Sequence, residues 1–357
     1  MDRVFKFGDK VVTDSGPSFV IAEVGHNHQG DVGKCKAIFK AAADAGADAV
    51  KIQKRDNRAL FTREMYESSY DSENAYGPTY GAHREFLEFG REQYLELKAY
   101  CDELGIIFFA TAFDESSVDF LAEIEMPGFK IGSGDLTDIG LLKKVASFGK
   151  PLIVSTGGAT LDDVRRAHEV VMPINRNLCI MQCTSGYPAP YEELNLRVIE
   201  TFRREFPDIV VGFSSHDPGI AMPLIGYMLG ARVFEKHFTL NRTWKGSDQA
   251  FSLEPAGLRR VVRDLERTRL ALGDGVKHPY PCEAGPLNKM VKRIVAARDL
   301  KANSTIQYSD LAFRVPVTRK ISDQTLKPFE AHRLVGRKLL RDVPSDDVLR
   351  YSDIASE

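Results

Sequence analysis

The sequence lacks long hydrophobic runs and carries almost no net charge. No stretch approaches the roughly 18 consecutive apolar residues of a membrane-spanning helix, and no apolar signal segment follows Met1. With 48 Lys and Arg against 50 Asp and Glu, the formal net charge is −2. A chain so balanced has no overall field that attracts nucleic acid or a membrane surface. We therefore expect a cytoplasmic protein with no nucleic-acid or membrane partner.

Cysteine and tryptophan are also scarce, with five and one residues. The odd number of cysteines and their irregular spacing match neither a CxxC motif nor a disulfide framework, which indicates small core residues in a reducing compartment. Hydrophobic residues make up 43% of the 357 positions, enough for a sizeable core. The length fits two domains, or one large barrel with a small appendage.

Short apolar runs alternate with amphipathic segments from residue 19 to about residue 275. Each run is rich in β-branched or aromatic residues and is bounded by Gly, Pro or polar residues, as buried parallel strands are. The runs span residues 19–25, 47–53, 106–113, 128–134, 151–158, 178–185, 209–215 and 231–238. Between the first two runs, Asp31 is placed to cap a helix that Gly46 ends.

Eight strands that alternate with helices over roughly 250 residues match the count of a (β/α)8 TIM barrel. A doubly wound open sheet is the alternative α/β fold, but the count favours the closed form. We expect the barrel to occupy residues 1–277, a Pro- and Gly-containing linker residues 278–290, and a small β-rich domain residues 291–357. A tyrosine-rich insertion, residues 54–91, is long enough to be a lid or binding element.

Two lysines stand inside the predicted strands, Lys51 in the second and Lys130 in the fourth. Functional groups of a barrel gather where its strands end, so both ammonium groups should reach one mouth. Because burying an unpaired charge is costly, they predict a ligand that carries phosphate or carboxylate groups. The alternative is an internal salt bridge to Glu23 or Asp135. Hydroxyl groups accompany the lysines at the strand ends, from Thr111, Ser133, Ser155, Ser185 and Ser214.

The seventh and eighth strands end in histidines, His216 and His237. Their strands should be neighbours, so the two imidazoles should face the same mouth. Each alone could be a core histidine, but the pair favours a divalent metal with open coordination positions. Water and substrate oxygens would complete such a shell, which suits Mn²⁺ or Mg²⁺ better than structural Zn²⁺.

Eight ordered motifs resemble the N-acetylneuraminate (sialic acid) synthase family. They are IAEVGHNHQGD, ADAVKIQK, FKIGSGD, VSTGG, QCTSGYP, GFSSHDPG, EKHFT and TWKGSDQAFSLEP, and they cover nearly the whole chain. In that family a TIM barrel is followed by a small antifreeze-like (SAF) domain. The resemblance implies condensation of phosphoenolpyruvate with N-acetylmannosamine or a related aldose, with release of phosphate and a metal, Mn²⁺ or Mg²⁺, as cofactor.

The resemblance also assigns roles to residues. It implies that Glu23, Asp135 and His216 are catalytic, and that His216 and His237 bind the metal. The residues implied to hold phosphoenolpyruvate are Lys51, Thr111, Lys130, Ser133, Ser155, Ser185 and Ser214. Those implied to contact the sugar are Gln53, Tyr187 and Asp248.

Some positions depart from the family pattern. Asp135 and Ser185 stand where many members have Glu and Asn. The family forms domain-exchanged homodimers in which an arginine of the second domain reaches a partner's barrel; here the local sequence FRVP displaces Arg314 by one residue. The segments TYGAHR, QCTSGYP and TWKGSD are closer to the branch that uses the 6-phosphorylated sugar. Residues able to meet that phosphate are Arg55, Arg63, His83 and Arg84.

Other functions stay open on the sequence alone. The same fold could serve synthesis of legionaminic- or pseudaminic-type acids, or another phosphoenolpyruvate-dependent keto-acid sugar synthase. Metal-assisted hydrolysis would use an HxH pair such as His26 and His28, although these follow the first strand within a glycine-bounded loop. A non-enzymatic carbohydrate-binding or scaffold protein is the remaining alternative, and it would not need the lysines.

Overall fold

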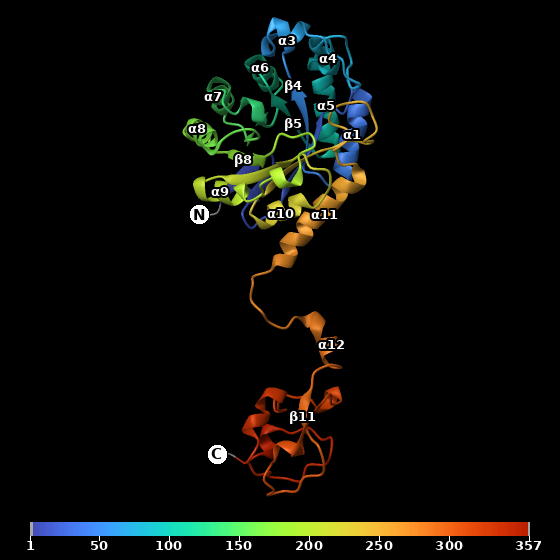
Figure 1. Cartoon of the computed structure of the whole chain (residues 1–357), viewed down its shortest axis with the longest axis vertical. Helices are drawn as coiled ribbons and strands as arrows, with labels where there is room; N and C mark the ends of the chain where they lie inside the picture. Colours follow the sequence, from blue (N-terminus) through green and yellow to red (C-terminus); the bar gives the residue numbers. More distant parts are fainter. Residues whose placement is uncertain (1–2, 356–357) are drawn as a thin grey trace. The chain divides into compact units, whose positions relative to one another are not determined.

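The structure is a computed structural model that describes residues 3–355. Eight parallel strands close into a barrel in which each strand pairs with its neighbour along the chain and the last, β10, pairs with the first, β3 (Figure 1). The strands are β3 (Phe19–Gly25), β4 (Ala49–Lys54), β5 (Ile107–Ala112), β6 (Phe129–Ile131), β7 (Leu152–Ser155), β8 (Leu178–Cys183), β9 (Val210–Ser215) and β10 (Val233–His237). All eight overlap the predicted runs, so the prediction of a TIM barrel is confirmed.

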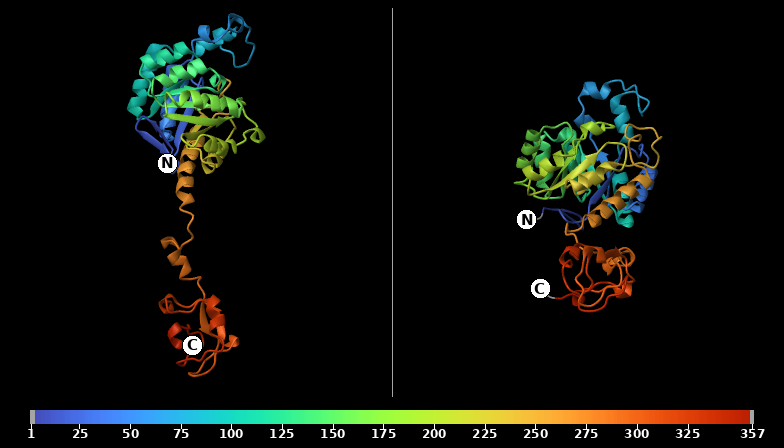
Figure 2. Two further views of the ribbon diagram at one scale, coloured as in Figure 1. Left: turned by 90° about the vertical axis from the view of Figure 1, so that its left-hand side faces the viewer. Right: turned by 60° about the horizontal axis from the view of Figure 1, so that its bottom comes forward.

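Amphipathic helices follow the strands and surround the barrel (Figure 2). They are α1 (Val32–Asp44), α5 (Arg91–Leu104), α6 (Glu115–Glu123), α7 (Ile139–Ser147), α8 (Leu161–Val171), α9 (Val198–Glu205), α10 (Met222–Met228) and α11 (Pro255–Leu272). Asp31 caps α1 as predicted, accepting a hydrogen bond from the Lys34 backbone N–H at 2.9 Å. After α1 the chain turns at Gly46, whose φ of +88° suits glycine.

An antiparallel hairpin closes the amino-terminal end of the barrel. It consists of β1 (Val4–Phe7) and β2 (Lys10–Thr13). The side chains of Phe5, Phe7 and Val12 join Phe109 and other inward-facing strand residues in one buried cluster. Because this cluster fills the lower interior, the barrel opens only at the carboxyl ends of its strands. The hairpin lies before the first predicted strand, and the sequence analysis missed it.

The insertion after β4 forms three short helices, α2 (Asn57–Leu60), α3 (Arg63–Glu67) and α4 (Tyr80–Leu87). In Figures 1 and 2 this insertion stands at the end of the barrel opposite the N-terminal hairpin. Tyr76 donates a hydrogen bond from its hydroxyl to the Lys245 carbonyl at 2.8 Å, and Asn74 accepts one from the Gly246 N–H at 2.9 Å. The insertion is therefore tied to the loop that follows β10.

The chain divides into two compact units, Met1–Gly273 and Asp274–Glu357. The second contains the short helix α12 (Ala284–Leu287) and one two-stranded antiparallel sheet, β11 (Arg293–Ala296) with β12 (Leu311–Arg314). Its own core includes Ile294, Leu300 and Leu339. This is the small C-terminal β region that was predicted. Near the end of this unit the chain forms a 3₁₀ turn, Tyr351–Asp353.

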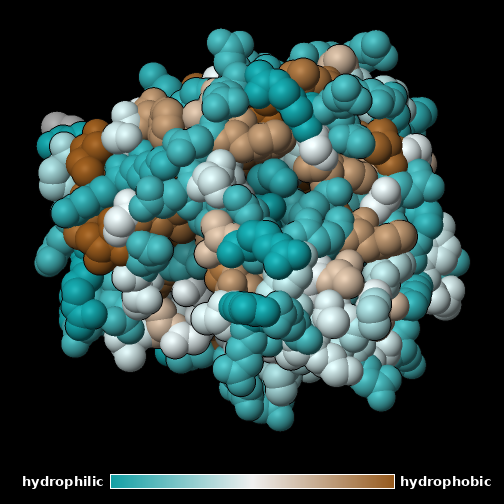
Figure 3. All heavy atoms as spheres, turned by 90° about the horizontal axis from the view of Figure 1, so that it is seen from above, coloured by the Kyte–Doolittle hydropathy of each residue, from teal (hydrophilic) through white to brown (hydrophobic). Residues whose placement is uncertain are grey.

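Disulfides are absent, since every cysteine of the chain lies within the described residues and is free. All five cysteines are free, and Cys282 is the exposed one. The face in Figure 3 is largely hydrophilic, and hydrophobic residues appear there in small separate groups. Within residues 3–355, no helix combines the length and apolarity needed to cross a bilayer.

Candidate active site

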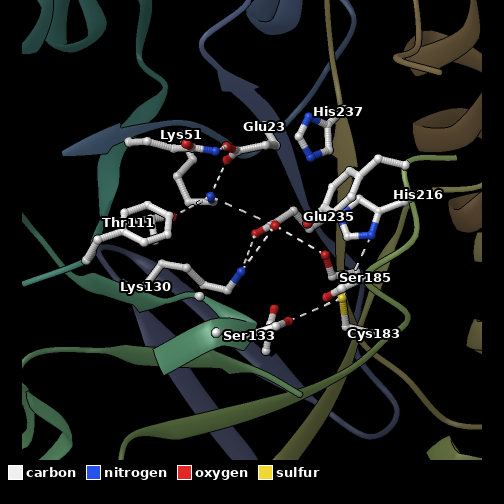
Figure 4. Close-up of a pocket in the computed structure, with 17 residues that line it drawn as sticks. Glu23, Lys51, Thr111, Lys130, Ser133, Cys183, Ser185, His216, Glu235 and His237 are labelled. Atoms are coloured by element: carbon white, nitrogen blue, oxygen red, sulfur yellow. Dashed lines mark hydrogen bonds and ion pairs between the residues drawn. The ribbon is translucent and has the colours of Figure 1, made fainter. Parts of the chain in front are cut away.

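A cavity of about 250 Å³ opens at the carboxyl ends of the strands (Figure 4). All but two of the residues predicted to form the site line it. The lining residues are Glu23, Lys51, Gln53, Thr111, Phe113, Lys130, Gly132, Ser133, Gly134, Ser155, Cys183, Ser185, Tyr187, Ser214, His216, Glu235 and His237. The two lysines and the two histidines therefore converge on one cavity, as their positions at strand ends predict.

Both lysines are buried and paired with carboxylates. Lys51 forms an ion pair with Glu23 and donates a hydrogen bond to Thr111 Oγ1 at 2.7 Å. Lys130 Nζ lies 3.1 Å from both oxygens of Glu235, and Lys51 Nζ lies 3.9 Å from the nearer of them. The salt bridge from Lys51 to Glu23 thus exists as the alternative interpretation expected, whereas Lys130 pairs with Glu235 rather than with Asp135.

The two cavity carboxylates have pKa values shifted in opposite directions. Burial raises the pKa of Glu23 above its usual range, although the neighbouring Lys51 offsets part of the shift. Burial acts in the same direction on Glu235, but Lys130 and Lys51 outweigh it and lower the pKa to about 2. Glu235 is therefore a permanent anion between two cations, and Glu23 is the carboxylate better suited to exchanging a proton.

Serine hydroxyls line the side of the cavity formed by β6, β7 and β8. Ser155 Oγ is buried and makes no hydrogen bond, so it is free to bind a ligand. Ser133 Oγ accepts a hydrogen bond from the Gly157 N–H at 2.9 Å. A Cβ atom at position 157 would overlap the Ser185 hydroxyl and lie 3.0 Å from Ser133 Oγ. The glycine is required because both serines pack against its backbone.

His216 and His237 lie together across the cavity from the two lysines, with ring centroids 5.2 Å apart (Figure 4). The Nδ1 atom of His216 lies 2.8 Å from the Thr184 carbonyl oxygen, which leaves Nε2 directed elsewhere. Burial lowers the pKa of His237 to about 3, so this imidazole is neutral near pH 7. Its Nδ1 atom is buried without a hydrogen bond and lies 3.6 Å from Asp248 Oδ2.

These donors fit a weakly held divalent cation. Two imidazoles face one cavity, and an orphaned ring nitrogen beside a carboxylate is a suitable metal ligand. Within residues 3–355 there is no group of three or more His, Cys, Asp or Glu arranged to hold a metal. Water and substrate oxygens would have to complete the coordination shell of such a cation.

Asp135 and Asp248 are the two predicted residues that do not line the cavity. Asp135 lies on the 3₁₀ turn after β6, where burial raises its pKa to about 6 and leaves Oδ2 without a hydrogen bond. Asp248 does not reach the cavity itself but lies beside His237, which lines it. A Cβ atom on Gly25, whose φ is +52°, would lie 3.0 to 3.3 Å from Glu23, Gln53 and Asp248. Because position 25 is a glycine, these three side chains can pack against the backbone at the end of β3.

The sequence analysis missed several lining residues. Glu235 lies between the two lysines. The alternation of side chains along 233–237 placed Glu235 and His237 on one face, and this was the signal for an inward carboxylate. Cys183 lies 3.9 Å from His216 Nδ1, and Phe113 forms part of the wall. No sequence signal distinguished these two from core residues.

Comparisons with known proteins show the family of the chain. The family model described as "NeuB family" matches residues 38–277, and the model described as "SAF domain" matches residues 291–355. The chain is 39% identical to "N-acetylneuraminate-9-phosphate synthase" of Mus musculus over 95% of this chain and 93% of that protein. It is 35% identical to "N,N'-diacetyllegionaminic acid synthase" of Legionella pneumophila over 94% of both.

A solved structure gives the same result. The N-acetylneuraminic acid (sialic acid) synthetase of Leptospira borgpetersenii, crystallised in complex with citrate, has a TM-score of 0.68 and 32% sequence identity. The comparison covers 80% of this chain and 96% of that one. The family match extends over most of the barrel and includes both lysines and both histidines of the cavity, whereas Glu23 lies before its first residue. The chain belongs to the NeuB family and carries a SAF domain after its barrel.

Proposed function

We propose that this enzyme of the NeuB synthase family makes a sialic-acid-type nonulosonic acid from phosphoenolpyruvate and N-acetylmannosamine or its 6-phosphate. The observation that carries the proposal is the convergence of Lys51, Lys130, His216 and His237 on one cavity. Such a cavity suits an anionic enol phosphate beside an aldehyde acceptor. In the overall reaction phosphoenolpyruvate, the aldose and one water give the 2-keto acid and inorganic phosphate.

Phosphoenolpyruvate binding is assigned to the lysine side of the cavity. Its carboxylate and phosphate would take Lys51 and Lys130 as counterions, and the unpaired Ser155 hydroxyl would donate a hydrogen bond. Ser133 and Ser185 adjoin this side through Gly157. Because Glu235 already neutralises part of the lysine charge, it would also limit how tightly the anion is held.

Condensation forms a carbon–carbon bond between carbon 3 of the enol and the aldehyde carbon of the sugar. A bound divalent cation would supply a Lewis acid for the aldehyde oxygen. Cationic character then develops at carbon 2, which Glu23 would stabilise while directing water to that carbon. The raised pKa of Glu23 suits it to accept the proton of that water. The carbon–oxygen bond to phosphate breaks, and the lysines would stabilise the departing phosphate.

The acceptor sugar is assigned to the histidine side of the cavity and its rim. Tyr187 packs against the His216 ring with centroids 4.3 Å apart, and Gln53 and Asp248 close around Gly25. The insertion, tied to the loop after β10 through Tyr76, would cover the bound sugar and exclude water.

Phosphate release in labelled water tests the reaction. Purified protein with Mn²⁺ and phosphoenolpyruvate should release phosphate only when N-acetylmannosamine, free or 6-phosphorylated, is added. In H₂¹⁸O the released phosphate should carry no label, because the carbon–oxygen bond is the one that breaks. Labelled phosphate, or no sugar-dependent release with any 2-acetamido or diacetamido hexose, would contradict the proposal. Arabinose 5-phosphate and erythrose 4-phosphate serve as acceptors for other keto-acid synthases and should be inactive.

A legionaminic-type product is the second candidate, supported by 35% identity to the Legionella pneumophila synthase. A 2,4-diacetamido hexose would then be the productive acceptor. Relative kcat/KM values for this sugar and for N-acetylmannosamine decide between the two products.

We also propose a homodimer with exchanged SAF domains, in which Arg314 completes the site of the other subunit. The family resemblance supports this arrangement, and Arg314 is half exposed while paired with Asp346. Light scattering should give twice the chain mass. Arg314→Ala and Lys130→Ala should each be inactive alone, and mixed subunits should regain activity. A monomer, or an active Arg314→Ala variant, contradicts the exchange.

A further inference from the structure

Two arginines flank one imidazole above the strand ends. Arg55 lies just after β4 and points Nη1 at His26 Nε2, 3.2 Å away. Arg84, on α4 of the insertion, points Nη1 at the other ring nitrogen, Nδ1, also 3.2 Å away. Their second terminal nitrogens donate hydrogen bonds of 2.7 Å, from Arg55 to Gln53 Oε1 and from Arg84 to the Tyr80 hydroxyl. Two guanidinium groups therefore contact the two nitrogens of the same neutral His26 ring.

This cluster lacks hydrogen-bond acceptors. A neutral imidazole has one acceptor nitrogen, so it can accept from Arg55 or Arg84 but not from both. The Arg84 Nε atom is buried and has no hydrogen-bond partner. Among residues 3–355, neither arginine has a carboxylate within ion-pairing distance, and the nearby Glu88 pairs through Oε2 with Lys54 Nζ at 3.1 Å. Burial and the neighbouring Arg84 lower the pKa of Arg55 to about 10, so Arg55 stays charged at neutral pH.

The cluster adjoins the cavity. Gln53, which accepts the hydrogen bond from Arg55, lines the cavity itself. Phe113 also lines it, and its ring centroid lies 3.7 Å from the Arg55 guanidinium carbon. A ligand whose one end reaches Gln53 can therefore place its other end at the arginines. Uncompensated guanidinium groups beside a ligand cavity are typical of phosphate recognition.

We propose that Arg55 and Arg84 bind the phosphate monoester of a 6-phosphorylated acceptor sugar and make the enzyme selective for it. The inference rests on the proposed function, since it assigns the acceptor for that same cavity. A phosphate dianion supplies the acceptors that both guanidinium groups lack, and the neutral His26 ring can donate its single N–H to it. The phosphate would bridge the end of β4 and helix α4, because Arg55 directly follows that strand and Arg84 lies on that helix.

The other two candidates from the sequence differ from this pair. Arg63 has a side chain that is 88% exposed and forms an ion pair with Glu67 on the same helix. His83 accepts a hydrogen bond from the Tyr76 N–H at 3.1 Å and packs among tyrosine rings. Arg63 is therefore a matched control: an arginine of the same insertion that already has a partner.

Acceptor kinetics test the inference. For wild type, Arg84→Gln and Arg63→Gln, kcat/KM is measured with N-acetylmannosamine 6-phosphate and with N-acetylmannosamine. Wild type should prefer the phosphorylated sugar. Arg84→Gln should reduce the ratio of the two values by about tenfold to a hundredfold, the range expected for losing a charge-assisted contact. Arg63→Gln should keep the wild-type ratio. A wild-type preference for the free sugar, or an unchanged ratio in Arg84→Gln, overturns the inference.

Direct binding separates this inference from the proposed function. If wild type releases no phosphate with either sugar, the proposed reaction fails, and calorimetric titration of both sugars still measures the phosphate contact. Arg84-dependent binding of N-acetylmannosamine 6-phosphate supports the site. If inorganic phosphate binds as tightly as the sugar phosphate, and its binding also depends on Arg84, the site binds a free anion. That result overturns the assignment. Arg84→Lys, which keeps the charge, should retain part of the preference if Arg84→Gln fails to fold.

Discussion

Lys130 and Glu235 meet across the interior of the barrel, with Lys130 Nζ 3.1 Å from both carboxylate oxygens. Their strands, β6 and β10, are four places apart in the closed order of eight strands, so they are diametrically opposite. Both side chains are almost fully buried, at 3% and 4% exposure. Both residues line the cavity, so the pair connects two opposite walls of the proposed substrate site.

Replacing Lys130 with alanine should both destabilise the protein and weaken phosphoenolpyruvate binding. Breaking a buried ion pair costs about 3–5 kcal/mol, because the remaining carboxylate loses its nearest counterion. Chemical denaturation and calorimetric titration with phosphoenolpyruvate measure the two effects. Lys144→Ala, which removes a surface pair with Asp119, should change stability by less than about 1 kcal/mol.

A double substitution separates the two roles of Lys130. Lys130→Met with Glu235→Leu removes both charges and should recover much of the lost stability, since apolar replacement of a buried pair is often neutral. Phosphoenolpyruvate binding should stay weak. Recovery of binding together with stability would show that the lysine acts only in folding.

Asp135 should make stability fall as pH rises through the acid range. Its folded-state pKa of about 6 exceeds its ordinary value of 3.8, so the folded protein holds a proton that the unfolded chain has lost between those values. Asp135→Asn should therefore be more stable than wild type at pH 7, by about 1–2 kcal/mol after allowance for partial exposure. Below about pH 4 the advantage should vanish. Denaturation curves at pH 4 and 7 measure it, and an advantage that grows on acidification contradicts the sign.

Removal of the metal should abolish the reaction, and His237 should set the metal affinity. EDTA should stop phosphate release, and Mn²⁺ or Mg²⁺ should restore it. His237→Asn should raise the Mn²⁺ concentration for half-maximal activity by more than about tenfold, because only two imidazoles are present. Mn²⁺ binding followed by electron paramagnetic resonance should weaken in parallel. His332→Asn, at an exposed position of the second unit, is the control and should leave both measurements unchanged.

Gly157→Ala should impair phosphoenolpyruvate binding more than folding. The added methyl group would displace the Ser185 and Ser133 side chains, which adjoin the lysine side of the cavity. We expect the KM for phosphoenolpyruvate to rise by about tenfold or more, consistent with loss of one or two hydrogen bonds. Gly285→Ala, whose Cβ would meet nothing within 4 Å, should leave KM unchanged. An unchanged KM in Gly157→Ala would exclude these serines from the binding site.

Much of the site followed from strand periodicity. Side chains alternate along a strand, so Lys51 with Gln53, and Glu235 with His237, had to share a face. The carboxyl ends of parallel barrel strands meet at one mouth, and this brought residues far apart in the chain to one cavity. The apolar runs predicted the barrel because only strands that are buried on both faces are apolar along their whole length.

The tertiary structure alone decided which charges meet. Hydrogen-bonded neighbours follow from strand order, but the contact of Lys130 with Glu235 depends on the width of the barrel and the reach of both side chains. The place of Arg84 beside Arg55 depends on how an insertion without strong periodicity folds back over the strand ends. The sequence by itself determined the barrel and the kinds of side chain at its mouth, because periodicity is a local property of the chain. Which of those side chains pair was decided by distances that exist only in the closed fold.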